Sequence, residues 1–288
     1  PRREASASVV DEARYLREFL RYAASVGMPY NVIEAFDQPW KRAQEGTVGG
    51  YWGIFDAQAR PKFAMHGPVV EIPRWWLGWL AGAVGALLFM LVGQRRRRWQ
   101  RSRGWLALGL AGFACGSALA WQARQMGYAC RDDWEWTISI VACVAALFTA
   151  LRLAAWLAGR LAGGPFKPAP AGRLRFAWLF LLALYGLLLV FDGRYRDFPL
   201  GLFALPCVGY ALTAWLDERR RRPSREALFL AAWLPLLAGV VVALELGENP
   251  STWLWFALNL LIAVPVFAAW RRARFAPVRA GTMLDGSH

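Results

Sequence analysis

The sequence predicts a mainly α-helical, polytopic membrane protein with about seven transmembrane helices, preceded by a truncated fragment of a (β/α)8 barrel. Apolar residues make up 57% of the chain, which contains 17 tryptophans and has a mean hydropathy of +0.27. These values are too apolar for a soluble globule of 288 residues. The apolar residues gather in runs that begin at about residue 75, and a polar segment precedes them.

The first expected element is an amphipathic helix over residues 9–26, because apolar side chains recur there at helical spacing. Ser8 can cap its first turn, with Asp11 reaching back toward the cap. Gly27 marks the end of the helix.

A short strand is expected next, over residues 31–37, and its alternation places Glu34 and Asp37 on opposite faces. Pro39 ends this strand, a glycine-rich loop follows, and residues 51–55 form a second strand-like run. A helix, a strand and then a polar loop beyond the carboxyl end of the strand is the order in which a β/α barrel builds its site.

The polar segment also resembles the end of the barrel in glycoside hydrolase family 17, the family of β-1,3-glucanases and β-glucan transglycosylases that includes bacterial β-glucan synthase-like proteins. In that family a Phe-Asp-Glu-Pro-Trp-Lys or Phe-Asn-Glu pattern precedes a Glu and a Trp-Gly or Phe-Gly. The matching residues here are Phe36-Asp37-Gln38-Pro39-Trp40-Lys41, then Glu45, then Trp52-Gly53-Ile54-Phe55. The resemblance covers about residues 8–64, a quarter or less of the chain.

Position by position, the resemblance matches Lys41 and Glu45 to residues that border the sugar-binding cleft. Gln38 departs from the pattern, since it stands where the family usually has Glu; its amide can hydrogen-bond sugar hydroxyls but cannot act as a general acid. The indoles of Trp40 and Trp52 can stack on pyranose faces, and core packing is the alternative role. The candidate substrate-binding residues are Glu34, Asp37, Gln38, Trp40, Lys41, Glu45 and Trp52.

No catalytic residue is assigned within this chain. Retaining glycoside cleavage generally needs two carboxyl groups about 5 Å apart, and the resemblance places the acid/base and the nucleophile on earlier barrel strands. The chain alone is therefore expected to be inactive. Glu34 and Asp37 are a second possible pair, which their opposite strand parity disfavours. Glu34 is expected to line or support the cleft, with a buried structural carboxylate as the alternative.

Seven apolar runs are expected to form transmembrane helices, because about 20 helical residues cross a hydrocarbon core. The fourth has a short apolar core and needs flanking arginines to extend toward the membrane surface. Gly78 with Gly82, and Gly112 with Gly116, give small-xxx-small spacings that allow close helix packing or, alternatively, dimerisation. The runs are 75–93, 104–122, 136–158, 176–191, 198–216, 226–246 and 252–270.

Arginine placement predicts the orientation. The loops after the first, third, fifth and seventh runs contain 19 lysines and arginines, and the opposite loops contain four. Because translocation resists positive charge, the C-terminus is expected in the cytoplasm and residues 1–72 on the other side. The implied location is the bacterial cytoplasmic (inner) membrane, with a periplasmic N-terminal domain. Since no signal sequence opens the chain, a fragment that begins inside a domain is expected; a mature protein cut from its signal is the alternative.

Composition also limits the partners. The net charge of +14 comes from short arginine blocks between apolar runs, a pattern that disfavours nucleic-acid binding. The four cysteines and two histidines lack metal-ligand spacing, so neither a metal nor another cofactor is expected. Few ionisable residues fall in mid-helix, which favours an anchor or scaffold over a pump or receptor.

Together these features predict four regions: a barrel fragment at 1–64, a linker at 65–74, a seven-helix domain at 75–270 and a cytoplasmic tail at 271–288. The resemblance implies a membrane-tethered, β-glucan-active enzyme, either a retaining hydrolase or a transglycosylase that makes or remodels periplasmic glucans. Its partners would be a β-glucan or oligosaccharide, the lipid bilayer and, by extension, machinery for glucan synthesis or export. The alternative is a non-enzymatic membrane component that binds or exports glucan.

Overall fold

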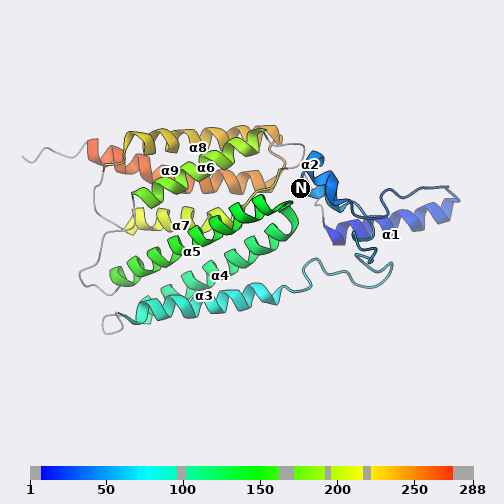
Figure 1. Cartoon of the computed structure of the whole chain (residues 1–288), viewed down its shortest axis with the longest axis horizontal. Helices are drawn as coiled ribbons and strands as arrows, with labels where there is room; N and C mark the ends of the chain where they lie inside the picture. Colours follow the sequence, from blue (N-terminus) through cyan, green and yellow to red (C-terminus); the bar gives the residue numbers. More distant parts are fainter. Residues whose placement is uncertain (1–7, 96–101, 162–171, 192–195, 217–221, 275–288) are drawn as a thin grey trace, which may run out of the picture.

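The computed structural model describes residues 8–95, 102–161, 172–191, 196–216 and 222–274. These residues are mainly helical. Long helices form a bundle, and a polar N-terminal segment lies beyond one end of it (Figure 1). The described residues contain no strand, so the expected barrel fragment is not seen in them.

The first helix, α1, spans Val9–Val26 as predicted. The hydroxyl of Ser8 accepts a hydrogen bond of 3.0 Å from the backbone N–H of Asp11, which caps the first turn. Gly27 adopts a left-handed conformation with φ of 62° and closes the last turn. The apolar face of α1 packs on Phe63, so the helix is held against the end of the same polar segment.

The two predicted strands at 31–37 and 51–55 are wrong as extended elements. Three backbone hydrogen bonds, 2.8–3.3 Å long, join residues 34–37 to residues 54–55, and only an isolated parallel bridge between Phe36 and Phe55 results. A pair this short, without further strands beside it, is too small to form a stable ladder. The intervening chain instead forms a 3-10 helix at Pro39–Lys41, the short helix α2 at Arg42–Glu45 and a 3-10 helix at Thr47–Tyr51.

Each of the seven predicted apolar runs contains a helix. Six of these helices are long and apolar enough to cross a membrane, by length and composition. The shortest is the fifth, α7, with 17 residues; at 1.5 Å per residue it spans about 26 Å. The helices are α3 (Trp76–Gln94), α4 (Ser102–Ala129), α5 (Asp133–Leu161), α6 (Arg173–Phe191), α7 (Leu200–Leu216), α8 (Arg225–Leu244) and α9 (Pro250–Arg274).

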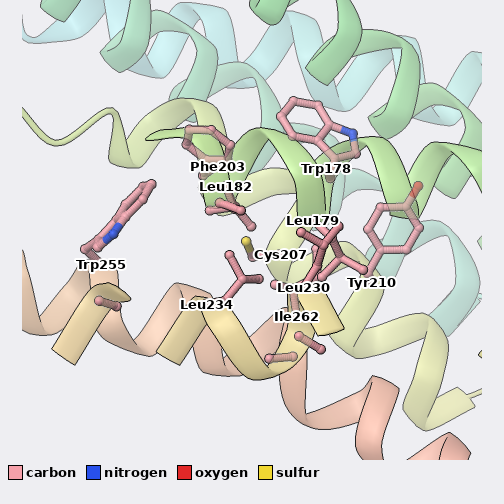
Figure 2. Packing of buried hydrophobic residues seen from close by; sticks show 14 of the residues in the cluster. Trp178, Leu179, Leu182, Phe203, Cys207, Tyr210, Leu230, Leu234, Trp255 and Ile262 are labelled. Atoms are coloured by element: carbon pink, nitrogen blue, oxygen red, sulfur yellow. The ribbon is translucent and has the colours of Figure 1, made fainter. Parts of the chain in front are cut away.

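The main core lies where α6, α7, α8 and α9 meet (Figure 2). Phe203 of α7 is fully buried and forms T-shaped ring contacts with Trp178 of α6, at 5.7 Å between ring centroids, and with Trp255 of α9, at 5.3 Å. Trp178 also donates a hydrogen bond of 2.8 Å to the hydroxyl of Thr149 on α5. The buried face of the short helix α7 therefore packs against both α6 and α9.

A close backbone approach joins α3 and α4. A Cβ atom on Gly116 would lie 1.9 Å from the carbonyl oxygen of Ala81, and one on Gly112 would lie 2.4 Å from that of Gly85. The glycine pair of α4 therefore packs against α3, as one of the two predicted alternatives requires. On α3 the close contacts come from Gly82 and Gly85, whereas Gly78 faces open space.

A buried ion pair lies where residues 196–199 approach the last turn of α8. The guanidinium of Arg196 is 2.7 Å from the carboxylate of Glu245, and the two side chains are 10% and 6% exposed. Arg196 also donates to the carbonyl oxygen of Leu189, and Asn249 donates to the same carboxylate at 3.4 Å. The pair fixes the connection between α6 and α7 to the end of α8.

Nine of the 19 lysines and arginines that predicted the orientation lie outside the described part of the chain. They include the arginines of 96–101, Lys167, the arginines of 219–221 and Arg279. Residues 275–288 of the predicted tail also lie outside it. The predicted linker at 65–74 is described and forms neither helix nor strand.

Candidate functional site

Asp37 lies inside the N-terminal segment. It is 8% exposed, and its Oδ1 accepts hydrogen bonds from the backbone N–H of Gly53 at 2.9 Å and from Nζ of Lys62 at 3.1 Å. A Cβ atom on Gly53 would lie 2.2 Å from the backbone N of Asp37, so only glycine allows this approach. Asp37 therefore holds the segment together, and its buried oxygen is engaged within the protein.

Lys62 has two further partners. Its Nζ lies 3.2 Å from Oε2 of Glu12 and donates to the carbonyl oxygen of Tyr51 at 2.8 Å. Partial burial raises the pKa of Glu12 above its ordinary value, and the nearby Lys62 only partly offsets this effect. One ammonium group thus connects α1, the 3-10 helix at Thr47–Tyr51 and Asp37.

Glu34 and Lys41 form a second ion pair, in which the side chains are 13% and 21% exposed. Nζ of Lys41 contacts Oε1 of Glu34 and lies 5.6 Å from the ring centroid of Trp40. The other oxygen of Glu34, Oε2, is buried and has no protein hydrogen-bond partner. A buried carboxylate oxygen without a partner is costly unless a water or a ligand hydroxyl binds it.

Two exposed tryptophans lie near this ion pair in the sequence. Trp40 is 61% exposed, and its indole N–H donates to Oε1 of Gln38 at 2.9 Å. Trp52 is 43% exposed, and its indole N–H donates to Oε2 of Glu45 at 3.2 Å. In each case a polar side chain holds the indole by its nitrogen while much of the ring faces solvent. This arrangement suits stacking on a ligand and differs from core packing.

The seven predicted binding residues therefore separate by environment. Asp37 is structural, Glu34 and Lys41 neutralise each other, and the remaining four form two polar-aromatic pairs. Neither Glu34 nor Asp37 is a free carboxylate, so the structure gives no support to their use as a catalytic pair. Among the described residues, no group of three or more His, Cys, Asp and Glu side chains converges as a metal site would require.

Sequence reasoning did not single out Glu12 and Lys62, although both take part in the ion pairs described above. Their positions in the sequence, 50 residues apart, carry no local signal, and only the folding of α1 onto the segment brings them together. Arg42 was also missed. It donates to the carbonyl oxygen of Tyr128 at 2.9 Å, at the end of α4.

The N-terminal segment is in contact with the bundle at several points. The ring of Tyr51 lies edge-on to that of Tyr128, with 5.7 Å between centroids. Thr47 donates to the carboxylate of Asp197, between α6 and α7, and Arg42 adds its bond to the α4 end. The surface that carries the tryptophans is therefore attached to the bundle by contacts outside the covalent connection at residues 65–74.

Comparisons with models of protein families, with curated proteins and with solved structures gave no match to this chain.

Proposed function

We propose that this chain belongs to a membrane-tethered, β-glucan-active protein, in which residues 1–64 are the last part of a family-17-like barrel and contribute a saccharide-binding surface. The reaction would be retaining cleavage of a β-glucan, with transfer of the glycosyl group to water or to another sugar. The basis is the resemblance of the motif around Phe36–Lys41 together with the arrangement of its side chains.

The observation that carries this proposal is the pairing of Trp40 with Gln38 and of Trp52 with Glu45. Each pair presents an exposed indole face beside an amide or carboxylate, the combination that contacts the apolar face and the hydroxyl groups of a pyranose together. The unpartnered oxygen of Glu34 adds a further acceptor for a hydroxyl.

A second candidate is a non-enzymatic protein that binds glucan or guides it during export. Two features favour it: Glu34 and Asp37 are both held in ion pairs with lysines, and an amide stands at Gln38 where the family usually has an acid. A side-chain amide does not ionise near neutral pH, so it cannot serve as a general acid. The resemblance assigns the catalytic carboxylates of such a barrel to other strands, so the two candidates share the same binding surface.

Binding is tested by calorimetric titration of the full chain with a β-1,3-linked glucose hexasaccharide, in a detergent without a sugar headgroup. Trp40→Ala and Trp52→Ala are each expected to weaken binding by about 1 kcal/mol, roughly fivefold, through loss of stacking. Trp134→Ala is the matched control, because Trp134 is 70% exposed on α5 and outside the site. Equal affinity in all variants, or no binding by the unsubstituted chain, would contradict the proposal.

The same oligosaccharide separates enzyme from binding protein. Products longer than the substrate indicate transfer, and shorter products alone indicate hydrolysis. Because Glu34 and Asp37 are ion-paired, we expect this chain alone to leave the substrate intact. Cleavage that Glu34→Gln abolishes would show that these carboxylates are catalytic after all.

We also propose that residues 1–72 lie in the periplasm of a bacterium with the arginine-rich loops in the cytoplasm, on the basis of the charge asymmetry of those loops. The test replaces the four cysteines and introduces Ser25→Cys, at an exposed position near the end of α1. A membrane-impermeant maleimide added outside intact spheroplasts is expected to label this cysteine. Labelling only after lysis would place α1 in the cytoplasm and reverse the proposed orientation.

A further inference from the structure

A shallow groove of about 380 Å³ lies at the arginine-rich end of the bundle, where α6 and α8 begin side by side. Most of its wall is apolar, and its rim carries one arginine. The lining residues are Phe176, Phe180, Arg225, Glu226, Phe229 and Leu230.

The groove faces away from the protein core. Phe180 and Phe229 are 54% and 65% exposed, and both lie on helices that are long and apolar enough to cross a membrane. Phe229 also stacks on Trp233, one turn further along α8, with 6.1 Å between ring centroids. The apolar surface therefore continues from the groove along α8 toward the middle of the helix, where acyl chains would meet it.

The mouth of the groove has an excess of positive charge. Arg225 lines it directly, and the exposed Arg173 lies one turn before Phe176 on α6. Glu226 is the acidic residue in the lining. A basic mouth above an apolar groove between membrane helices complements a phospholipid that has a negatively charged head group, because the phosphate and the acyl chain find their partners at matching depths.

We propose that this groove binds an anionic phospholipid, with an acyl chain against Phe180 and Phe229 and the head group at Arg225. This site is separate from the saccharide-binding surface, which lies at the other end of the bundle (Figure 1). Its occupant follows from the position of the groove on the face of α6 and α8 that lipid would cover, and from the sign of the charge at its mouth.

Native mass spectrometry of the full chain in detergent tests the head-group contact, with dioleoyl phosphatidylglycerol and dioleoyl phosphatidylcholine supplied at equal concentration. Arg225→Gln is expected to reduce retention of phosphatidylglycerol about fivefold and to leave phosphatidylcholine unchanged. Arg271→Gln is the control, because Arg271 is exposed at the end of α9 and outside the groove. Equal losses in both variants, or equal retention of both lipids by the unsubstituted chain, would overturn the proposal.

A second pair of variants tests the acyl-chain contact. Phe229→Ala is expected to weaken phosphatidylglycerol retention, whereas Phe148→Ala, at a 55% exposed position on α5, is expected to leave it unchanged. Thermal denaturation of each variant establishes that the bundle is folded. A folded Phe229→Ala chain that keeps its lipid, or one that loses only self-association, would assign the groove to a different occupant and overturn the proposal.

Discussion

The ammonium nitrogen of Lys62 lies 3.1 Å from Oδ1 of Asp37. The two residues are 25 positions apart, and their side chains are 12% and 6% exposed. Asp37 also accepts a hydrogen bond from the backbone N–H of Gly53. Its carboxylate therefore links the chain around residue 37 to the chain around residues 53 and 62, where the described residues form no continuous sheet. The backbone bridge between Phe36 and Phe55 is too short to do so alone.

Lys62→Met should destabilise the N-terminal segment by roughly 2–4 kcal/mol, because it leaves Asp37 buried without its cation. Hydrogen exchange of the amides of residues 34–63 in the full chain measures the change. The double variant Asp37→Asn with Lys62→Met should recover part of the loss, since the uncompensated charge is gone. A double variant less protected than Lys62→Met would contradict this account of the pair.

The stability of the same segment should depend on the protonation of Glu12. Burial raises its pKa in the folded protein above the reference value of 4.5, so the folded state holds this proton more tightly than the unfolded chain does. Ionised Glu12 therefore costs stability at neutral pH, and the cost disappears as the pH falls through the raised pKa. The stability of the unsubstituted chain relative to Glu12→Gln should increase between about pH 7 and about pH 4.

Exchange rates of the α1 amides, corrected for the intrinsic rate at each pH, provide the measurement for Glu12. Glu18→Gln is the control, because Glu18 is exposed on the same helix. If instead the unsubstituted chain becomes less stable relative to Glu12→Gln as the pH falls, then the attraction of Lys62 outweighs the effect of burial on Glu12.

Gly116→Ala should lower the free energy of unfolding of the bundle by about 1–3 kcal/mol, because the added methyl group would meet the backbone carbonyl of Ala81 at 1.9 Å. Backbone atoms cannot rotate away as a side chain does, so α3 and α4 would have to separate. Gly127→Ala is matched to it on α4, where nothing lies within 4 Å of the added atom. That variant should be neutral or slightly stabilising, since alanine favours helix. Chemical unfolding in detergent, followed by circular dichroism, distinguishes the two; equal effects would argue against close packing at Gly116.

Arg196→Met should cost about 3–5 kcal/mol, because it removes the guanidinium that lies 2.7 Å from the buried carboxylate of Glu245. Arg131→Met is the comparison, since Arg131 pairs with Glu135 at a more exposed position, where ion pairs contribute roughly 0–1 kcal/mol. Unfolding free energies of the two variants should therefore differ by at least about 2 kcal/mol. Similar losses of unfolding free energy would mean that the buried pair at Arg196 stabilises the fold no more than the exposed pair at Arg131 does.

The helices were predictable because their signals are local. The Ser8 cap and Gly27 set both ends of α1. The apolar runs identified the ends of the seven long helices to within four residues, except that α4 continues seven residues beyond its predicted end. The strands failed because a strand depends on partners that local alternation does not reveal. The chain between them, predicted as a loop after Pro39, forms short helical turns. Gly85 was missed for a similar reason, since its contact with Gly112 crosses between two helices.

The candidate site was predictable in its residue types and not in its pairings. The motif identified Trp40 and Trp52 as candidates for stacking, and the structure leaves both partly exposed. The predicted strand alternation disfavoured Glu34 and Asp37 as a catalytic pair. In the structure, Glu34 pairs with Lys41, seven residues away, and Asp37 pairs with Lys62, 25 residues away. Contacts at such separations depend on the folded path of the chain, which sequence spacing alone does not supply.

The contacts of Arg42 and Tyr51 with Tyr128 have a consequence for how any ligand reaches the tryptophan surface. Because these contacts attach the surface to the bundle, we expect the surface to keep its position relative to the helices and not to move independently on residues 65–74. A polymer that emerges through or along the same membrane would encounter it at a high effective concentration, without a search through bulk solution. If the proposed saccharide site is correct, this attachment would raise the frequency of encounter with such a polymer; Arg42→Gln would then lower that frequency and leave the affinity for a short soluble oligosaccharide unchanged.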